Sequence, residues 1–110
     1  MRLLALVLAG LSSLAGSVAL AGALPGQPDP VHGKALAQSL CSNCHLVAPD
    51  QEHANADVPS FREIANLPGQ TTGDIIARIM LPKHPMPEIP LTKGELADLA
   101  AYIISLRDQP

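Results

Sequence analysis

The sequence has very few bulky aromatic side chains. Its 110 residues include no tryptophan, one phenylalanine (Phe61) and one tyrosine (Tyr102). Aromatic side chains usually supply much of the buried area of a small domain. Because they are scarce here, we expect another bulky group to fill the middle of the fold.

Basic residues are scarce as well. Seven Lys and Arg side chains stand against ten Asp and Glu, which gives a formal net charge of −3. A protein that binds nucleic acid needs a basic surface to neutralise the phosphates. We therefore expect no nucleic-acid partner.

The start of the chain has the character of a secretory signal. An apolar run, Leu3–Leu20, follows a single basic residue, and small residues next to it offer cleavage after Ala21 or Ala23. We therefore predict that residues 1–23 are a cleaved signal peptide. Residues 24–110 would then form one domain in the periplasm, with no membrane span after cleavage. The alternative is a retained anchor, because the run is just long enough to cross a bilayer.

Both cysteines of the chain lie in one stretch, Cys41-Ser42-Asn43-Cys44-His45. Two cysteines three positions apart, followed at once by a histidine, are the pattern of a c-type haem attachment site. In one helical turn Cys41 and Cys44 lie on one face, so their thiols can form thioethers with the two vinyl groups of one porphyrin. His45 can then reach the iron as the proximal ligand. A covalent haem would also supply the bulky centre and the staple that so short a domain needs.

The cysteines also permit other interpretations: a structural disulfide, half of a zinc site, or a thioredoxin-like redox pair. A zinc site would need further ligands, and the chain has no second cysteine pair. A thioredoxin-like pair belongs in a β-α-β context, which is not visible here. We therefore prefer the haem interpretation.

The rest of the sequence predicts an all-α domain of about four short helices, with no strand alternation and no internal repeat. Asp29 ahead of Pro30 forms an N-cap, and capping boxes begin at Ser60 and Thr92. The expected helices run from Pro30 to about Leu40, from Ser60 to Asn66, from Thr71 or Thr72 to before Pro82, and from Thr92 to Leu106.

The spacing of apolar residues predicts the buried face of each helix. In the first helix we expect Leu36 and Leu40 on the buried side. Gly33 is a poor helix former, and it fits a position where another helix crosses closely. The expected apolar faces of the third and last helices are Ile75, Ile76, Ile79 and Met80, and Leu96, Leu99, Ile103 and Leu106.

A haem that carries electrons needs both axial positions of its iron filled by protein, so that coordination hardly changes between oxidation states. The side chains that could supply the second ligand are Met80, Met86, His84, His53 and His32. Met80 lies at helical spacing, where methionine usually fills a core, and His53 belongs to a polar loop. Met86 stands between two prolines that fix the backbone and remove competing N–H donors. Met86 is therefore the predicted ligand, with His84 as the alternative.

These features together resemble the small monohaem class I cytochromes c, from Gly33 to Arg107. The matching pieces are Gly33 eight residues ahead of Cys41, the Cys41–His45 motif, Pro59-Ser60-Phe61, His84-Pro85-Met86-Pro87 and the helix from Leu96 to Leu106. The resemblance implies the class I cytochrome c fold, with the helices around one covalently attached haem. It also implies that the first and last helices cross near Gly33 and Tyr102.

The resemblance further implies roles for Pro59 and Phe61. The Pro59 backbone carbonyl would accept a hydrogen bond from the second ring nitrogen of His45, which orients the imidazole. Phe61 would pack on the haem.

The sequence departs from the family in two places. Ala37 stands where the family often has an aromatic residue, so the helix crossing should rely more on Tyr102. The best-known members surround their exposed haem edge with lysines, whereas this chain has only Lys34, Lys83 and Lys93. We therefore do not expect docking through a ring of lysines.

The function predicted is electron transfer and not enzymatic catalysis. The protein would be a periplasmic one-electron carrier with one covalent haem c, anchored by Cys41 and Cys44 and ligated by His45 and Met86. Its partners would be redox proteins: a reductase or dehydrogenase as donor, and an oxidase or reductase as acceptor. The alternatives are a permanent haem subunit of a dehydrogenase or oxidase complex, a peroxidase-like or sensor-like haem protein, and a copper module, which leaves the cysteines unexplained.

Overall fold

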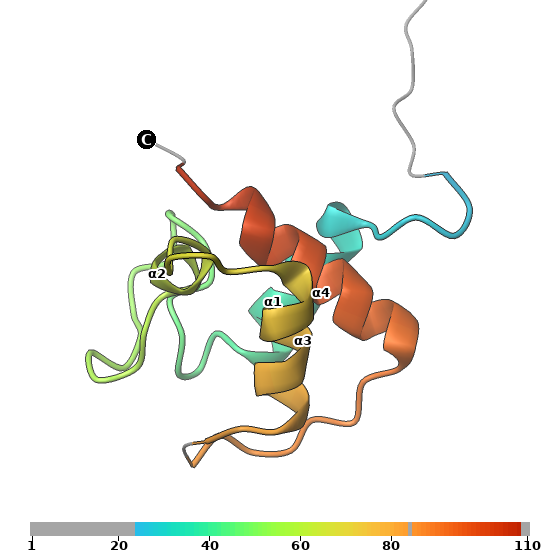
Figure 1. The fold of residues 1–110 in the computed structure, drawn as a ribbon. Coiled ribbons are helices and arrows are strands. Elements are labelled where there is room, and N and C mark those ends of the chain that lie inside the picture. The colour runs from blue at the N-terminus through green and yellow to red at the C-terminus, as the bar shows by residue number, and fades with distance from the viewer. Residues whose placement is uncertain (1–23, 84, 109–110) are drawn as a thin grey trace, which may run out of the picture.

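A computed structural model describes residues 24–83 and 85–108, and its helices follow the predicted order (Figure 1). They are α1 (Pro30–Leu40), α2 (Phe61–Ala65), α3 (Thr72–Met80) and α4 (Lys93–Ser105). No strand occurs in these two ranges, and the all-α prediction is confirmed. None of their helices has the length and apolar character needed to cross a bilayer. The predicted signal peptide, residues 1–23, and His84 lie outside the described residues.

Each helix begins where the sequence supplies an N-cap. The Asp29 carboxylate accepts hydrogen bonds from two backbone N–H groups in the first turn of α1. Ser60, Thr71 and Thr92 each open a complete capping box ahead of α2, α3 and α4. These bonds satisfy N–H groups that the start of a helix otherwise leaves unpaired. The predicted helix starts are therefore confirmed, with Thr71 as the cap of α3.

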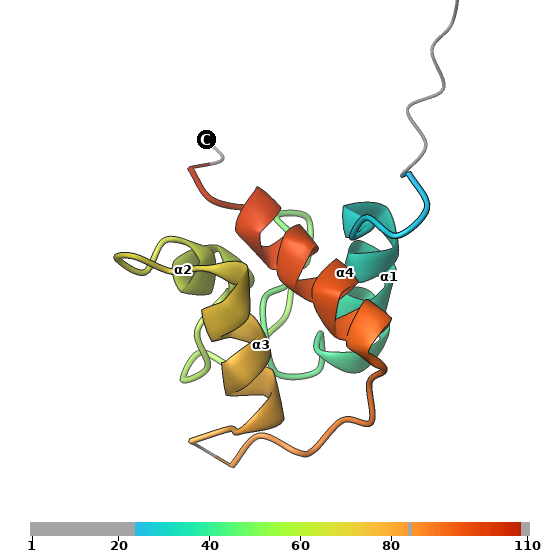
Figure 2. The same cartoon turned by 45° about the vertical axis from the view of Figure 1, so that its right-hand side comes forward.

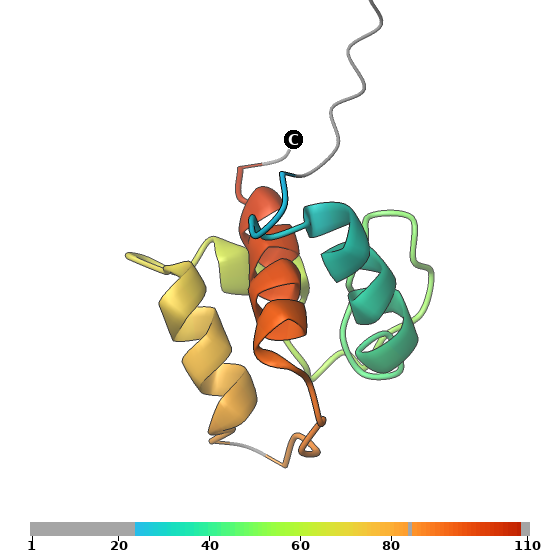
Figure 3. The ribbon, with the colours of Figure 1, turned by 90° about the vertical axis from the view of Figure 1, so that its right-hand side faces the viewer.

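The central helix is α4. It packs against each of the other three helices, and Figure 3 shows it standing between α1 and α3. Leu96, Leu99 and Ile103 of its predicted stripe are buried, and Leu106 is partly buried against the same core. The burial predicted for the last helix is therefore confirmed.

The first and last helices, α1 and α4, cross each other (Figure 2), and they approach closely at Gly33. A Cβ atom on Gly33 would lie 2.0 Å from the backbone oxygen of Asp98 and 2.9 Å from the Cβ of Tyr102. The close crossing predicted here is confirmed. Its contact face on α1 consists of the small residues Gly33 and Ala37. The prediction for Leu40 is wrong, since its side chain is 41% exposed: Leu40 is the last residue of α1 and lies about two turns past the crossing at Gly33.

The prediction that Met80 fills the core is also wrong. Ile75 of α3 is buried, but the Met80 side chain is 60% exposed. Met80 is the last residue of α3, so no further turn of the helix continues beyond it to cover its side chain. Leu81, which follows, is 76% exposed. The end of α3 therefore presents apolar side chains at the surface.

Candidate haem-binding site

The Cys41–His45 stretch forms a single helical turn directly after α1. The His45 backbone N–H donates to the Cys41 carbonyl oxygen at 2.9 Å, and the Cys44 N–H donates to the same oxygen at 3.2 Å. In a turn of this kind, residues three apart are neighbours. Both cysteines are free thiols, with Cys41 half-buried and Cys44 exposed. The turn therefore offers two thiols of the kind that thioether formation needs.

Burial changes the chemistry of one of these thiols. It raises the pKa of Cys41 from 9.0 to about 11, because burial disfavours the charged thiolate. At neutral pH the Cys41 side chain in the folded polypeptide is therefore a neutral thiol.

The imidazole of His45 is held in one tautomer. Its Nδ1 atom lies 2.7 Å from the backbone carbonyl oxygen of Pro59. Because a carbonyl oxygen only accepts hydrogen bonds, Nδ1 is the nitrogen that carries the hydrogen. Nε2 is left with its lone pair free, which is the state in which a histidine ligates a metal through Nε2. The contact expected between His45 and Pro59 is thus present.

Phe61 forms one wall beside this imidazole. It is the first residue of α2 and is 4% exposed. Its ring centroid lies 5.3 Å from that of His45, with the two planes tilted by 52°. The Phe61 backbone N–H also donates to the Leu46 carbonyl oxygen at 2.9 Å. The start of α2 therefore places an apolar ring against His45, whereas packing of Phe61 on a haem stays a prediction.

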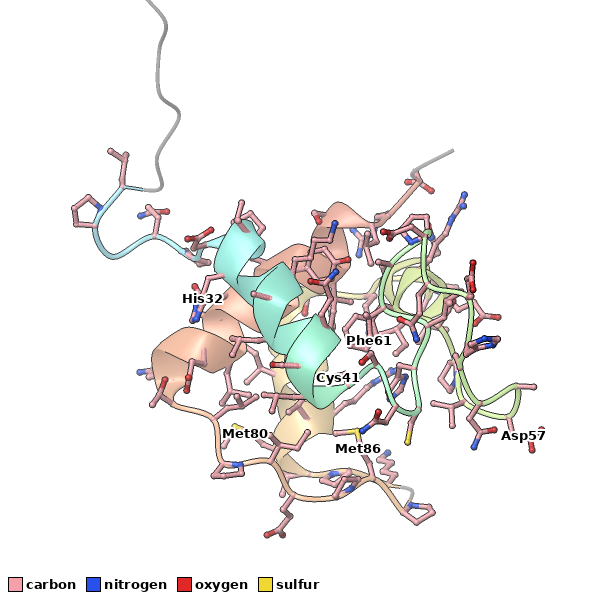
Figure 4. The ribbon with its side chains drawn as sticks, turned by 180° about the vertical axis from the view of Figure 1, so that it is seen from behind. His32, Cys41, Asp57, Phe61, Met80 and Met86 are labelled. Carbon is pink, nitrogen blue, oxygen red and sulfur yellow. The ribbon has the colours of Figure 1, made fainter. Side chains whose placement is uncertain are left out.

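Met86 comes from a third part of the chain. It lies in the segment between α3 and α4 and is half-buried, with Pro85 and Pro87 exposed on either side of it. Figure 4 labels Cys41, Phe61 and Met86, which follow α1, begin α2 and follow α3 respectively. Three separate elements therefore supply the thiols, the apolar wall and the thioether.

The other candidates for the second ligand differ from Met86 in their surroundings. His32 lies in the first turn of α1, nine residues before Cys41 and so about 13 Å away along the helix. Its Nδ1 atom is 2.8 Å from Asp98 Oδ2, which holds the ring at the crossing with α4. His53 is exposed, as is Met80. His84 lies outside the described residues.

Two residues support the motif through contacts that were not predicted from the sequence. The Tyr102 hydroxyl, buried on α4, donates to the Val47 carbonyl oxygen at 2.6 Å. The Gln51 side chain accepts a hydrogen bond from the Val47 N–H and donates to three backbone carbonyls. Tyr102 was expected only at the crossing of the first and last helices, through the family resemblance, and a single glutamine in a polar loop gives no signal.

The sequence of this chain is also similar to that of a known protein. Over 108 residues, the chain is 42% identical to cytochrome c-552 of Bradyrhizobium diazoefficiens. The aligned region covers 97% of this chain and 95% of that protein. This chain belongs to the small class I c-type cytochromes. No family model matches the chain of this cytochrome, and no solved structure matches it. The four helices of its described residues form the class I cytochrome c fold, as the resemblance implied.

The described residues of this cytochrome fit a c-type haem. One turn carries two free thiols and an imidazole whose Nε2 is available. A half-buried methionine lies in a segment stiffened by prolines. Two thiols, one imidazole and one thioether are the donor set that haem c with His/Met ligation requires.

Proposed function

We propose that this cytochrome is a periplasmic one-electron carrier with a single, covalently bound haem c. The observation that carries the proposal is the Cys41–His45 turn, in which the Pro59 carbonyl leaves Nε2 of His45 free. The 42% identity to a cytochrome c-552 supports it. When bound, the haem would supply an iron that takes up and releases one electron.

The chain's own residues would do four things for that cofactor. Cys41 and Cys44 would anchor it through thioethers, and His45 and Met86 would fill the two axial positions. Pro59 would keep the His45 imidazole oriented and raise its basicity. As a neutral thioether ligand, Met86 would favour the reduced iron and so would raise the potential.

A site with both axial positions filled by protein suits a carrier better than an enzyme. A substrate could reach the iron only after Met86 had left. Phe61, almost fully buried beside His45, would keep water from the imidazole. We therefore propose electron exchange with other redox proteins and no catalytic role for this chain.

The proposed partners are redox proteins that meet the carrier through a small, short-lived interface. The chain has only three lysines for charge steering. Met80 and Leu81 expose apolar surface at the start of the segment between α3 and α4 that carries Met86, called here the Met86 segment. Contact would rest on this apolar surface, so electron-transfer rates should depend weakly on ionic strength. A steep dependence would contradict this mode of docking.

The full chain, expressed in a bacterium that attaches haem c, tests the proposal. The periplasmic protein should give a low-spin haem spectrum in both oxidation states, and the haem should stay with the polypeptide after denaturation. N-terminal sequencing should find Gly22 or Leu24 first. Haem that acidic organic solvent extracts would contradict covalent attachment, and a high-spin spectrum in either state would contradict the carrier role. A membrane-bound protein that begins at Met1 would contradict the signal-peptide proposal.

A further inference from the structure

The Gln51 side chain contacts four backbone groups around the Cys41–His45 turn. Its Oε1 accepts from the Val47 N–H at 3.0 Å. Its Nε2 donates to the carbonyl oxygens of Ser42 at 3.0 Å, His45 at 2.9 Å and His53 at 2.7 Å. One half-buried side chain therefore joins both ends of the motif to the loop that follows it.

The orientation of this amide follows from its partners. Nε2 carries two hydrogens and faces three acceptors, so one hydrogen is shared between two carbonyls. A flipped amide would place Oε1 against three carbonyl oxygens and Nε2 against the Val47 N–H. Only the observed orientation satisfies all four contacts. Position 51 therefore requires a side chain that is as long as glutamine and that carries both a hydrogen-bond donor and an acceptor at its end.

His45 is consequently held at two points. Its backbone carbonyl accepts from Gln51 Nε2, and its ring Nδ1 donates to the Pro59 carbonyl. The Pro59 bond alone leaves the backbone of the turn able to shift, and the ring would shift with it. Hydrogen bonds from Asn55, Phe61 and Tyr102 restrain neighbouring carbonyls of this stretch, and the contact with Gln51 restrains the backbone at His45 itself, from which the ring projects.

We propose that Gln51 is a positioning residue, which sets the plane of the His45 imidazole by fixing the backbone of the Cys41–His45 turn. The inference rests on the proposed function, in which His45 ligates the haem iron. The orientation and basicity of an axial imidazole tune a haem site. Gln51 therefore acts on the redox properties of the site through His45, without a contact of its own to the cofactor.

The test compares Gln51→Glu with Gln38→Glu in the holoprotein. Gln38 is exposed on α1, and its side chain makes no hydrogen bond to another described residue, so this variant makes the same charge change without the same contacts. At position 51, a carboxylate would face three carbonyl oxygens that have lost their donor. Its pKa should be raised, and its protonated form would regain one donor.

The readouts are the hyperfine-shifted haem-methyl signals of the ferric protein and the midpoint potential as a function of pH. Gln51→Glu should alter the pattern of methyl shifts and add a pH-dependent step to the potential. Gln38→Glu should keep the wild-type pattern and the wild-type pH profile. A Gln51→Glu protein with lowered thermal stability but unchanged shifts and potential would overturn the inference, since Gln51 would then be structural only.

A second variant keeps the test decisive if Gln51→Glu yields no holoprotein. Gln51→Met keeps a similar volume and removes all four hydrogen bonds without adding charge, so it should change the methyl shifts without the new pH step. Unchanged shifts in this variant would overturn the inference. The proposed function fails separately: a wild-type protein without low-spin, His45-ligated haem would refute that function, whatever the variants show.

Discussion

The two sides of the candidate haem site are held in place by different means. On the His45 side, five backbone carbonyls between Ser42 and Val47 accept hydrogen bonds from the following loop, from α2 and from α4. On the Met86 side, no hydrogen bond joins residues 82–83 or 85–91 to another described part of the chain. Four prolines between positions 82 and 90 stiffen that segment instead.

This difference predicts how firmly the protein holds each of the two proposed iron ligands, His45 and Met86. Hydrogen bonds tie the His45 backbone to neighbouring elements, so movement there breaks several contacts at once. Prolines restrict the backbone of the segment and lower the entropy of its unfolded state, but they do not tie it to anything. Leu91 packs against the core, but no comparable set of hydrogen bonds holds the described residues between Pro82 and Leu91. We therefore expect the proposed ligand Met86 to leave the iron before the proposed ligand His45 does.

The largest effect should come from removing the covalent attachment of the haem, on which both sides of the site depend. The double variant Cys41→Ala/Cys44→Ala should lack covalent haem and should not fold, because so short a chain loses its central group. Haem staining after denaturing electrophoresis and far-ultraviolet circular dichroism would measure both outcomes, with the two single variants as controls. A helical double variant that unfolds cooperatively would show that the polypeptide core suffices.

The next largest effect should come from substitutions of Met86, which change only one side of the site. Met86→Ala should abolish the weak far-red charge-transfer band of ferric iron, open the iron to water and lower the potential. The decrease should be a clear part of the roughly 0.8 V range that axial ligands span. Met86→His should keep a low-spin iron and also lower the potential, because imidazole stabilises ferric iron better. Visible spectra and redox titration would measure these changes.

Met80→Leu is the matched control for Met86. The exposed Met80 side chain should tolerate this swap, which typically costs under about 1.5 kcal/mol even in a core, and the band and the potential should stay as in the wild type. Loss of the band in Met80→Leu would mean that the ligand assignment is wrong.

A smaller effect should come from loosening the packing of α1 against α4, which supports both sides of the site. Gly33→Ala places a Cβ atom 2.0 Å from the Asp98 backbone oxygen, so α1 and α4 must move apart. The free energy of unfolding should fall by about 1–3 kcal/mol, while the far-red band persists. Gly94→Ala is the control, because nothing lies within 4 Å of its Cβ position and alanine favours a helix. Equal stability of the two variants in denaturant would contradict the tight crossing.

The smallest effect should appear at His32, remote from both ligands. Its hydrogen bond to Asp98 is the main cause that raises the pKa of His32 above 6.5, and the charges of Asp98, Asp29 and Glu95 add to it. The stability from this pair is therefore complete below pH 6.5 and is lost as the pH rises through the raised pKa. His32→Asn should lower the free energy of unfolding at about pH 5.5 and change it little at about pH 8.5.

The control for this variant is His53→Asn, at an exposed histidine in the loop after the motif. It should leave the pH dependence of unfolding as it is in the wild type. If His32→Asn showed the same loss of stability at both pH values, the ion pair with Asp98 would not be the source of the effect.

Local chemistry made much of this fold predictable. Asp29, Ser60 and Thr92 cap helices through atoms within three residues of themselves, so the sequence carried the whole signal. The exposure of Leu40 and Met80 was not predictable in this way, because burial depends on what crosses the helix and where the helix ends.

The candidate site was predictable to a similar extent. The Cys41–His45 turn follows from residue spacing, and the Pro59 contact came through the family resemblance. The role proposed for Gln51 had no signal in the sequence, since all its partners are backbone atoms. Backbone groups are the same at every position, so only the path of the chain shows which of them a side chain can reach.

The crossing of α1 and α4 has a consequence for the order of events as the protein is made. The Asp29 N–H bonds to an Asp98 oxygen 69 residues further along the chain, and Gly33 packs against the same turn of α4. The helix that leads into the motif therefore has no docking partner until nearly the whole chain has been synthesised. Throughout that interval the core against which Cys41 packs is incomplete, so we expect its thiol to be less buried and its pKa less raised than in the finished fold. The period in which the Cys41 thiol is fully open to reaction is thus limited by the arrival of the last helix, whereas Cys44 stays exposed in the finished fold.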